Sequence, residues 1–254
     1  MTTSGFKVES GVQLLSRLYK KPEVNTFYPT LFTTAPKHGD IIEISSKDPA
    51  VTFVTDIICE ISLPDQLGGS GIDVLVLCTD GNFSMDRLFQ VLYKKISLLA
   101  DVVDERVIQQ CLKKIFIVNL YDENQLHSTI QNLECTLMEH PNIGLIILNS
   151  ITAFYWSEHG FKLIKMDDYL QNMLNEIQNV IKEFKPIVMY TRPQHFGTDR
   201  YQEIHKINMG NSDTKDAHYI CINTKNTHFE VQIASNLKIK TKNFTIKDGE
   251  INWL

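Results

Sequence analysis

Short apolar runs alternate with longer amphipathic stretches along residues 38–191, and this alternation constrains the fold more than any other feature of the sequence. The apolar runs, which predict strands, cover residues 41–44, 73–79, 115–120, 144–149 and 187–191. The stretches between them have helical spacing and cover residues 50–61, 85–99, 105–113, 124–140 and 167–184. Strands that are apolar on both faces and are connected by helices form a parallel sheet with helices on both sides. We therefore expect an α/β fold.

The pattern changes after Thr191. Residues 195–217 are polar with no apolar period, which predicts a long loop. The rest of the chain contains the alternating stretches HYICIN, HFEVQIA, LKIKT, FTIK and EINWL, and Asp248-Gly249 is a hairpin signal before the last of them. We expect antiparallel C-terminal strands beside the mostly parallel sheet.

Composition limits the class of protein. A chain of 254 residues with 43% hydrophobic and 22% charged residues is long enough for one large globular domain. Its five cysteines form no CxxC pair, so neither a disulfide framework nor a zinc site is supported. No apolar run reaches membrane-spanning length and the N-terminus has no signal-peptide core, so we expect an intracellular protein without a membrane partner. The net charge of −5 gives no general attraction to nucleic acid.

The first 37 residues differ from the rest and are expected to lie outside the core, which we place at residues 38–254. Residues 8–19 resemble a short amphipathic helix, and residues 20–37 contain three prolines and an aromatic cluster, which predicts an extended linker. An exposed aromatic segment of this kind is suited to partner binding. We assign partner binding to Phe27, Tyr28, Leu31 and Phe32, and packing of this segment on its own domain is an equally weighted alternative.

The loop after the first core strand is where P-loop proteins carry GxxxxGK[ST]. Here it reads Ser-Ser-Lys-Asp-Pro over residues 45–49, without glycine, and Thr52 follows Val51 rather than lysine. Asp48 suits an N-cap and Pro49 the first helical position. A capping carboxylate would fill the anion site of the helix N-terminus and repel a phosphate. Taken alone, this segment favours the alternative, an ordinary capped helix in a protein that never bound nucleotide.

Three other polar residues follow predicted strands, at the sheet edge where ligands bind. Asp80 could orient a water for attack on a phosphate, or it could cap the helix that begins near Ser84. Asn149 stands where a Walker B strand has its magnesium-binding aspartate, and a neutral amide should hold magnesium weakly. Gln194 could sense a γ-phosphate, or it could be a simple loop residue.

The segments HGDIIEI, TDGNFSMDRL and IILNSITAFYW and the strand ending in Gln194 resemble the core of the RecA-family recombinases. Within that family the chain resembles the recombination paralogues, through ESGVQLLSRL, YPTLF, SITAFYW and FTIKDGEINWL. The resemblance covers nearly the whole chain and is weakest at residues 195–235. It implies a RecA-like P-loop NTPase core and no small N-terminal helical domain.

The resemblance also implies roles for single residues. Ser46, Lys47, Asp48 and Thr52 replace the P-loop, Asp80 matches the catalytic glutamate, Asn149 the Walker B aspartate and Gln194 the sensor glutamine. Compared with the family's motifs, this chain lacks the lysine and the glycines of the P-loop and the Walker B aspartate that binds magnesium. We therefore expect ATP and magnesium to bind weakly or not at all and no hydrolysis. The alternative is a nucleotide-regulated, DNA-dependent ATPase with an atypical P-loop.

The expected function is that of a non-catalytic subunit of a nuclear recombinase-paralogue complex, which supports homologous recombination and double-strand break repair by helping to load the recombinase on single-stranded DNA. Its partner would be another RecA-family paralogue. A P-loop-derived scaffold unrelated to DNA is a further alternative.

Contact with single-stranded DNA through the complex would involve the loops at residues 157–165 and 195–217. The candidate DNA contacts are Arg200, His205, Lys206, Lys238 and Lys240. Nearby acidic residues make the long loop weakly attractive to phosphate. The lysines would equally suit the protected edge of a sheet.

Overall fold

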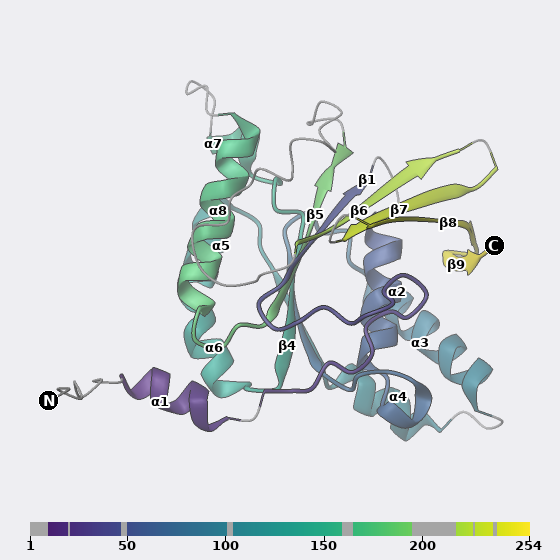
Figure 1. Cartoon of the computed structure of the whole chain (residues 1–254), viewed down its shortest axis with the longest axis horizontal. Helices are drawn as coiled ribbons and strands as arrows, with labels where there is room; N and C mark the ends of the chain where they lie inside the picture. Colours follow the sequence, from purple (N-terminus) through teal and green to yellow (C-terminus); the bar gives the residue numbers. More distant parts are fainter. Residues whose placement is uncertain are drawn as a thin grey trace, which may run out of the picture.

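The computed structural model of the chain describes residues 10–19, 21–46, 50–100, 104–158, 165–194, 217–225, 227–235 and 238–254, without the side chains of Glu158, Ala217, Ser235 and Lys238 (Figure 1). Its helices are α1 (Gly11–Leu18), α2 (Ala50–Ser62), the 3-10 turn η1 (Asp65–Leu67), α3 (Met85–Leu99), α4 (Glu105–Leu112), α5 (Glu123–Gln131), α6 (Leu133–Glu139), α7 (Tyr155–Glu158) and α8 (Met166–Ile181). Its strands are β1 (Ile41–Ser46), β2 (Asp73–Cys78), β3 (Ile115–Asn119), β4 (Ile143–Asn149), β5 (Ile187–Pro193), β6 (Ala217–Thr224), β7 (Phe229–Ser235), β8 (Lys238–Lys247) and β9 (Glu250–Trp253).

The strands form one sheet in the order β3-β2-β4-β5-β1-β6-β7-β8-β9. The first six strands in this order, β3, β2, β4, β5, β1 and β6, pair in parallel. Strand β7 is antiparallel to β6, β8 to β7, and β9 to β8. The α/β class, the mostly parallel sheet and the antiparallel C-terminal strands are therefore confirmed. The details differ in three places. HYICIN forms β6, which lies parallel to β1; LKIKT and FTIK form one strand, β8; and the helix expected at 124–140 divides at Asn132.

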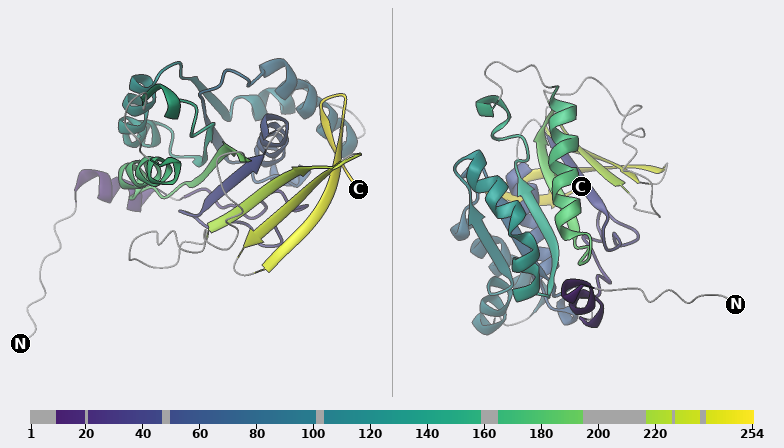
Figure 2. Two further views of the ribbon diagram at one scale, coloured as in Figure 1. Left: turned by 90° about the horizontal axis from the view of Figure 1, so that it is seen from above. Right: turned by 90° about the vertical axis from the view of Figure 1, so that its left-hand side faces the viewer.

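Both faces of the parallel part of the sheet are covered by helices, as Figure 2 shows. In β4 the side chains of Leu145 and Ile147 enter the hydrophobic core shared with α2, α3 and α4. Those of Ile146 and Leu148 enter the second core, shared with α5, α6 and α8. Successive strand residues point to opposite faces, so a strand buried on both sides is apolar throughout. This is why unbroken apolar runs identified the central strands.

The segment assigned to partner binding packs on its own domain, which was the equally weighted alternative, and its predicted exposure is wrong. Phe27 and Tyr28 are 1% exposed, Leu31 2% and Phe32 6%, and all four belong to the core on the α2 face. The ring of Phe27 meets that of Phe32 edge to face, with centroids 5.1 Å apart. The backbone N–H groups of Leu31 and Phe32 donate to the carbonyl of Tyr28, which folds the segment into a turn. Burial of large apolar side chains stabilises this packing.

A polar network fixes the same segment to the helices. The Tyr28 hydroxyl donates to Asp56 of α2, and the indole N–H of Trp253 donates to the Tyr28 oxygen at 3.3 Å. Lys95 of α3 completes the group, with its Nζ 3.1 Å from Asp56 and 2.9 Å from Glu60. The carboxylates of these two residues outweigh burial and raise the pKa of Lys95. The segment expected to be a linker is thus part of the core, joined to α2, α3 and β9.

Candidate functional site

The carboxyl ends of parallel strands β1, β2, β4 and β5 meet at one edge of the sheet, where open α/β sheets bind ligands. The structure brings Asp80, which follows β2, together with Asn149, the last residue of β4. The Asn149 amide nitrogen lies 3.3 and 3.4 Å from the two carboxylate oxygens of Asp80. The Asn149 amide oxygen accepts from the Thr191 hydroxyl at 2.8 Å. The sequence-based placement of Asp80 and Asn149 at one site is therefore correct.

This polar chain uses both ends of the Asn149 amide. Asn149 is 2% exposed, so an amide without partners here would be costly. Its N–H group compensates the Asp80 carboxylate, which an aspartate at this position could not do. Asp80 also accepts from the backbone N–H of Asn82 at 3.2 Å. The alternative role of Asp80 as a helix cap is wrong, because Ser84 caps α3.

The segment expected in place of a phosphate loop is described only at its two ends. Lys47 and Asp48 lie outside the described residues, and Ser46, at the end of β1, is 5% exposed. Thr52, in the first turn of α2, is also 5% exposed. Its hydroxyl oxygen accepts from the Arg87 guanidinium at 2.6 Å. The same guanidinium nitrogen donates to the Gly249 carbonyl at 2.7 Å, which joins the β8–β9 hairpin to this position.

Arg87 was missed by sequence reasoning, although it lies inside the motif TDGNFSMDRL. No spacing rule links it to Thr52, 35 positions away. The structure shows that a cation of the chain itself holds the Thr52 hydroxyl in the first turn of α2. Among the described residues the Arg87 Nε has no hydrogen-bond partner and is buried.

Replacement of Arg87 by methionine is expected to lower the free energy of unfolding by about 2 kcal/mol, because two hydrogen bonds from a charged donor are lost. Urea denaturation followed by circular dichroism measures the change. Arg106→Met on the exposed face of α4 is the matched control and should change stability by about 0.5 kcal/mol or less. Equal effects of the two substitutions would show that the Arg87 contacts contribute nothing.

Gln194 is not brought into the Asp80–Asn149 chain. Its amide nitrogen donates to the Asn223 side chain at 2.9 Å and approaches the Cys221 sulfur at 3.4 Å, so it is joined to β6. Its Oε1 is buried and has no hydrogen-bond partner among the described residues. The proposed sensor position therefore faces a different strand from the other two residues of the expected site.

A second polar group, also missed, lies between β1, β5 and β6. Glu43 is 4% exposed and accepts from the Tyr190 hydroxyl at 2.6 Å and from the Arg192 Nε. Burial lowers the pKa of Arg192, but the Glu43 carboxylate raises it by more, so the pKa of Arg192 is raised overall. Burial and then Glu43 raise the pKa of Tyr219 to about 12. A glutamate within the apolar run at residues 41–44 was the signal that could have revealed this group.

The buried side chains of Tyr28 and Tyr190 are expected to make the protein less stable at alkaline pH. Burial and then Asp56 raise the pKa of Tyr28, and burial and then Glu43 raise that of Tyr190. The unfolded chain releases the phenol protons near pH 10, whereas the folded state keeps them. The stability contribution is therefore complete below about pH 10 and falls as pH rises through the folded pKa values. Urea denaturation at pH 8–11 should show this decline, and Tyr190→Phe should weaken it. A free energy of unfolding that stays constant to pH 11 would contradict the expectation.

The predicted DNA contacts are only partly described. Arg200, His205 and Lys206 lie outside the described residues, as does the side chain of Lys238. Lys240 is half-buried on β8. Strand β9 pairs only with residues 244–247 of β8, so Lys240 lies in the half of β8 that β9 leaves unpaired. This position agrees with the alternative reading of these lysines as protection of a sheet edge.

The described residues lack two features. They contain no group of three or more histidine, cysteine, aspartate or glutamate side chains arranged to hold a metal ion. In that part of the chain, no helix has both the length and the apolar character needed to cross a membrane.

Comparison with known proteins gives two informative relatives, although no protein-family model matches the chain. It is 29% identical to DNA repair protein XRCC2 of the mouse, Mus musculus, over 73% of this chain and 68% of the mouse protein. It is 22% identical to the DNA repair protein XRCC2 homolog of Arabidopsis thaliana, over 89% of this chain and 70% of the plant protein. The resemblance to a recombination paralogue, and in particular to X-ray repair cross-complementing protein 2, is therefore confirmed.

Proposed function

We propose that this chain, a relative of DNA repair protein XRCC2, is a non-catalytic subunit of a recombinase-paralogue complex in the nucleus. Its core is RecA-like and its nucleotide site is degenerate. The complex would act in homologous recombination and double-strand break repair by assisting recombinase loading on single-stranded DNA. The names of both relatives, which are DNA repair proteins, support the repair role. The parallel sheet with helices on both faces supports the RecA-like core.

Two contacts, Arg87–Thr52 and Asn149–Asp80, support the proposal that the subunit is non-catalytic. A site for magnesium and a nucleoside triphosphate needs a free hydroxyl, a charged carboxylate ligand and a cation directed at the phosphates. Here the hydroxyl is held by a guanidinium. The carboxylate position carries an amide that donates to Asp80. The polar groups described here compensate one another without a ligand, so these described residues do not fit ATP and magnesium.

In the proposed assembly role, the protein acts through the surfaces that contact its partners. With a net charge of −5, the chain alone offers little attraction to DNA. Contact with single-stranded DNA would therefore depend on the complex, and the direct partner would be another RecA-family paralogue.

Affinity purification of the tagged full chain followed by mass spectrometry tests this proposal. The expected result is recovery of another recombinase paralogue in a stable complex, with and without added ATP. The Asp80→Ala variant should retain the same partner, because Asp80 serves no nucleotide. Recovery of stable partners that include no recombination factor would support the scaffold alternative and reject this proposal.

One observation favours the alternative, a nucleotide-regulated ATPase. Asp80 keeps an exposed carboxylate at the carboxyl edge of the sheet, where it could still orient a water. DNA-dependent ATP hydrolysis by the purified chain, abolished by Asp80→Ala, would favour this alternative over a non-catalytic subunit.

A further inference from the structure

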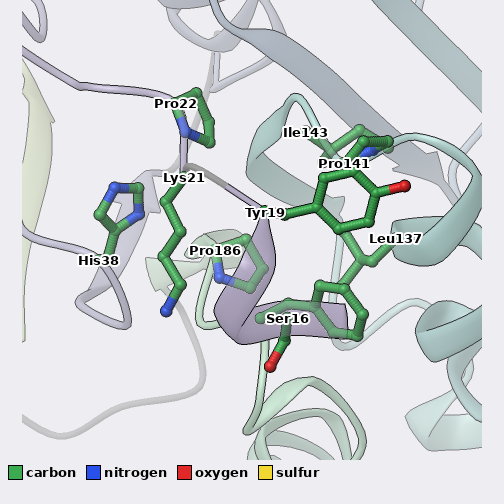
Figure 3. Close-up of a pocket in the computed structure, with 10 residues that line it drawn as sticks. Ser16, Tyr19, Lys21, Pro22, His38, Leu137, Pro141, Ile143 and Pro186 are labelled. Carbon is green, nitrogen blue, oxygen red and sulfur yellow. The ribbon is translucent and has the colours of Figure 1, made fainter. Parts of the chain in front are cut away.

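A small hollow lies between α1 and the amino-terminal ends of β4 and β5, lined in part by Tyr19, Pro22 and Ile143 (Figure 3). Its volume of about 20 Å³ leaves room for about one water molecule, so it is too small for a larger ligand. A partner of this protein is therefore expected on an open surface, and strand β8 offers one that has unused binding groups.

One side of strand β8 is only partly paired. Strand β7 pairs with residues 238–244 along the other side, and β9 pairs with residues 244–247 on this side. The backbone N–H of Leu254 donates to the Asn243 carbonyl at 3.0 Å, which extends this pairing by one residue. Strand β8 is much longer than β9, as Figure 1 shows. In the part of the chain that the structure describes, no strand pairs with residues 238–242 on this side.

The backbone groups on the open side belong to alternate residues. In an antiparallel ladder, successive residues direct their N–H and C=O groups to opposite sides of the strand. Because the Asn243 carbonyl accepts from Leu254, the backbone groups of Thr241 and Ile239 point to the same side as that carbonyl. Both residues are exposed. An extended segment along this edge would therefore meet donors and acceptors that no described strand uses.

The side chains of this edge are basic on one face of the sheet and apolar on the other. Lys240 pairs with Ile233 of β7, whose side chain belongs to the core shared with α2. Directly paired residues have their side chains on one face, so Lys240 and, two positions further, Lys242 lie on that face. Ile239 points to the other face and is 68% exposed.

The charge of the two lysines is not neutralised locally. Lys242 is exposed and Lys240 is half-buried. Among the described residues, no carboxylate lies within ion-pair distance of either lysine. Two copies of this edge paired with each other would bring like charges together, which is unfavourable. The lysines therefore oppose self-association at this edge and favour an acidic strand.

An acidic peptide fits this edge better than single-stranded DNA does. Phosphates would contact the lysines but would leave the backbone groups and the apolar side chain of Ile239 unused. A peptide strand uses all three, because its backbone continues the ladder and its side chains alternate between the two faces.

We propose that the unpaired part of β8, residues 238–242, binds an extended segment of a partner protein in which acidic and apolar residues alternate. The segment adds to the sheet as a strand, with its carboxylates beside Lys240 and Lys242 and its apolar side chains beside Ile239. This inference gives the chemistry of one partner segment, and so it rests on the proposed assembly role.

The test uses three peptides of equal length in amide NMR titrations of the full chain. N-acetyl-Glu-Val-Glu-Val-Glu-amide has the alternating pattern, and N-acetyl-Gln-Val-Gln-Val-Gln-amide is its neutral isostere. N-acetyl-Glu-Glu-Val-Val-Glu-amide has the same composition as the first without the alternation. The alternating acidic peptide should bind about fivefold more tightly than either of the others. Equal binding of the two acidic peptides would indicate charge attraction alone and would overturn the proposal.

Hydrogen exchange locates the bound peptide on the strand. The N–H groups of Ile239 and Thr241 face the open side and should exchange more slowly when the alternating acidic peptide is bound. Those of Lys240 and Lys242 face β7 and should change little. Slower exchange elsewhere, with none at Ile239 and Thr241, would reject addition of a strand to β8.

Two variants separate the backbone from the charge. Thr241→Pro removes an N–H on the open side and no bond to β7, and sheet edges tolerate proline in this position. It should abolish binding of the alternating acidic peptide. Lys242→Gln should weaken this binding about threefold. Lys247→Gln is the matched control, because Lys247 is exposed on the same strand where β9 already pairs, and it should leave binding unchanged.

If Thr241→Pro does not fold, Lys242→Gln and the three peptides still test the proposal. Binding that neither variant weakens would overturn it. Single-stranded oligothymidylate that shifts the amides of Lys240 and Lys242, while none of the peptides binds, would assign this edge to DNA and would also overturn it. Because the peptides need no recombination factor, failure here is distinguishable from failure of the proposed function.

Discussion

Replacement of Phe27 by alanine is expected to lower the free energy of unfolding by about 3–5 kcal/mol, as large-to-small substitutions of buried aromatic residues do. Phe27 is 1% exposed and contacts Phe32 edge to face. Its removal would leave a cavity in the core that α2 shares with the C-terminal strands. Urea denaturation, with the midpoint and the slope determined together, measures this loss.

Phe89 provides the matched control for Phe27. It is 47% exposed on α3, so Phe89→Ala should lower the free energy of unfolding by about 0.5 kcal/mol or less. Similar effects of both substitutions would show that Phe27 is not a core residue. The comparison also separates folding from partner binding. If Phe27→Ala abolishes a complex while the chain remains folded, the original assignment of partner binding to this segment regains support.

Replacement of Asn149 by aspartate is expected to lower the free energy of unfolding by about 3 kcal/mol at pH 7. The new carboxylate would be buried beside that of Asp80, where an amide now donates a hydrogen bond. Removal of this donor leaves a buried carboxylate in contact with the exposed carboxylate of Asp80, without a hydrogen bond between them. Asn142→Asp, at an exposed position before β4, is the control and should have little effect.

The pH dependence of Asn149→Asp gives an independent check. Burial and the neighbouring carboxylate would raise the folded-state pKa of the introduced aspartate, so the variant would regain stability as pH falls toward about 4. Magnesium at millimolar concentration should not restore stability at pH 7. A variant as stable as the wild type, or one that magnesium restores, would show that the site still favours a metal ion.

The central strands could be predicted because each is buried on both faces and therefore apolar throughout. The pairing of β6 could not be predicted from the sequence. The direction of a strand depends on the connection that precedes it and on which strand of the sheet is free to pair with it. HYICIN has the alternating character of an antiparallel strand, yet it pairs in parallel with β1. Its other neighbour, β7, is antiparallel, so β6 joins the two parts of the sheet.

The meeting of Asp80 and Asn149 was predictable, since both follow strands that end at the same edge. Arg87 and the Glu43–Arg192 pair were not, because these contacts join residues far apart in the chain by tertiary packing alone. The position of Phe27 shows a different limit. An aromatic, proline-bounded segment has the same composition whether it packs on its own core or on a partner, and only the geometry distinguishes the two cases.

Thermal unfolding of the purified full chain with ATP and magnesium tests most directly whether the nucleotide site is lost. A ligand that binds the native state raises its stability, by about 2.7 kcal/mol at a concentration 100 times its dissociation constant. We predict the same melting temperature with millimolar ATP and magnesium as with sodium tripolyphosphate at equal ionic strength. A melting temperature that rises with ATP concentration, and does not rise with tripolyphosphate, would contradict a non-catalytic subunit with a closed nucleotide site.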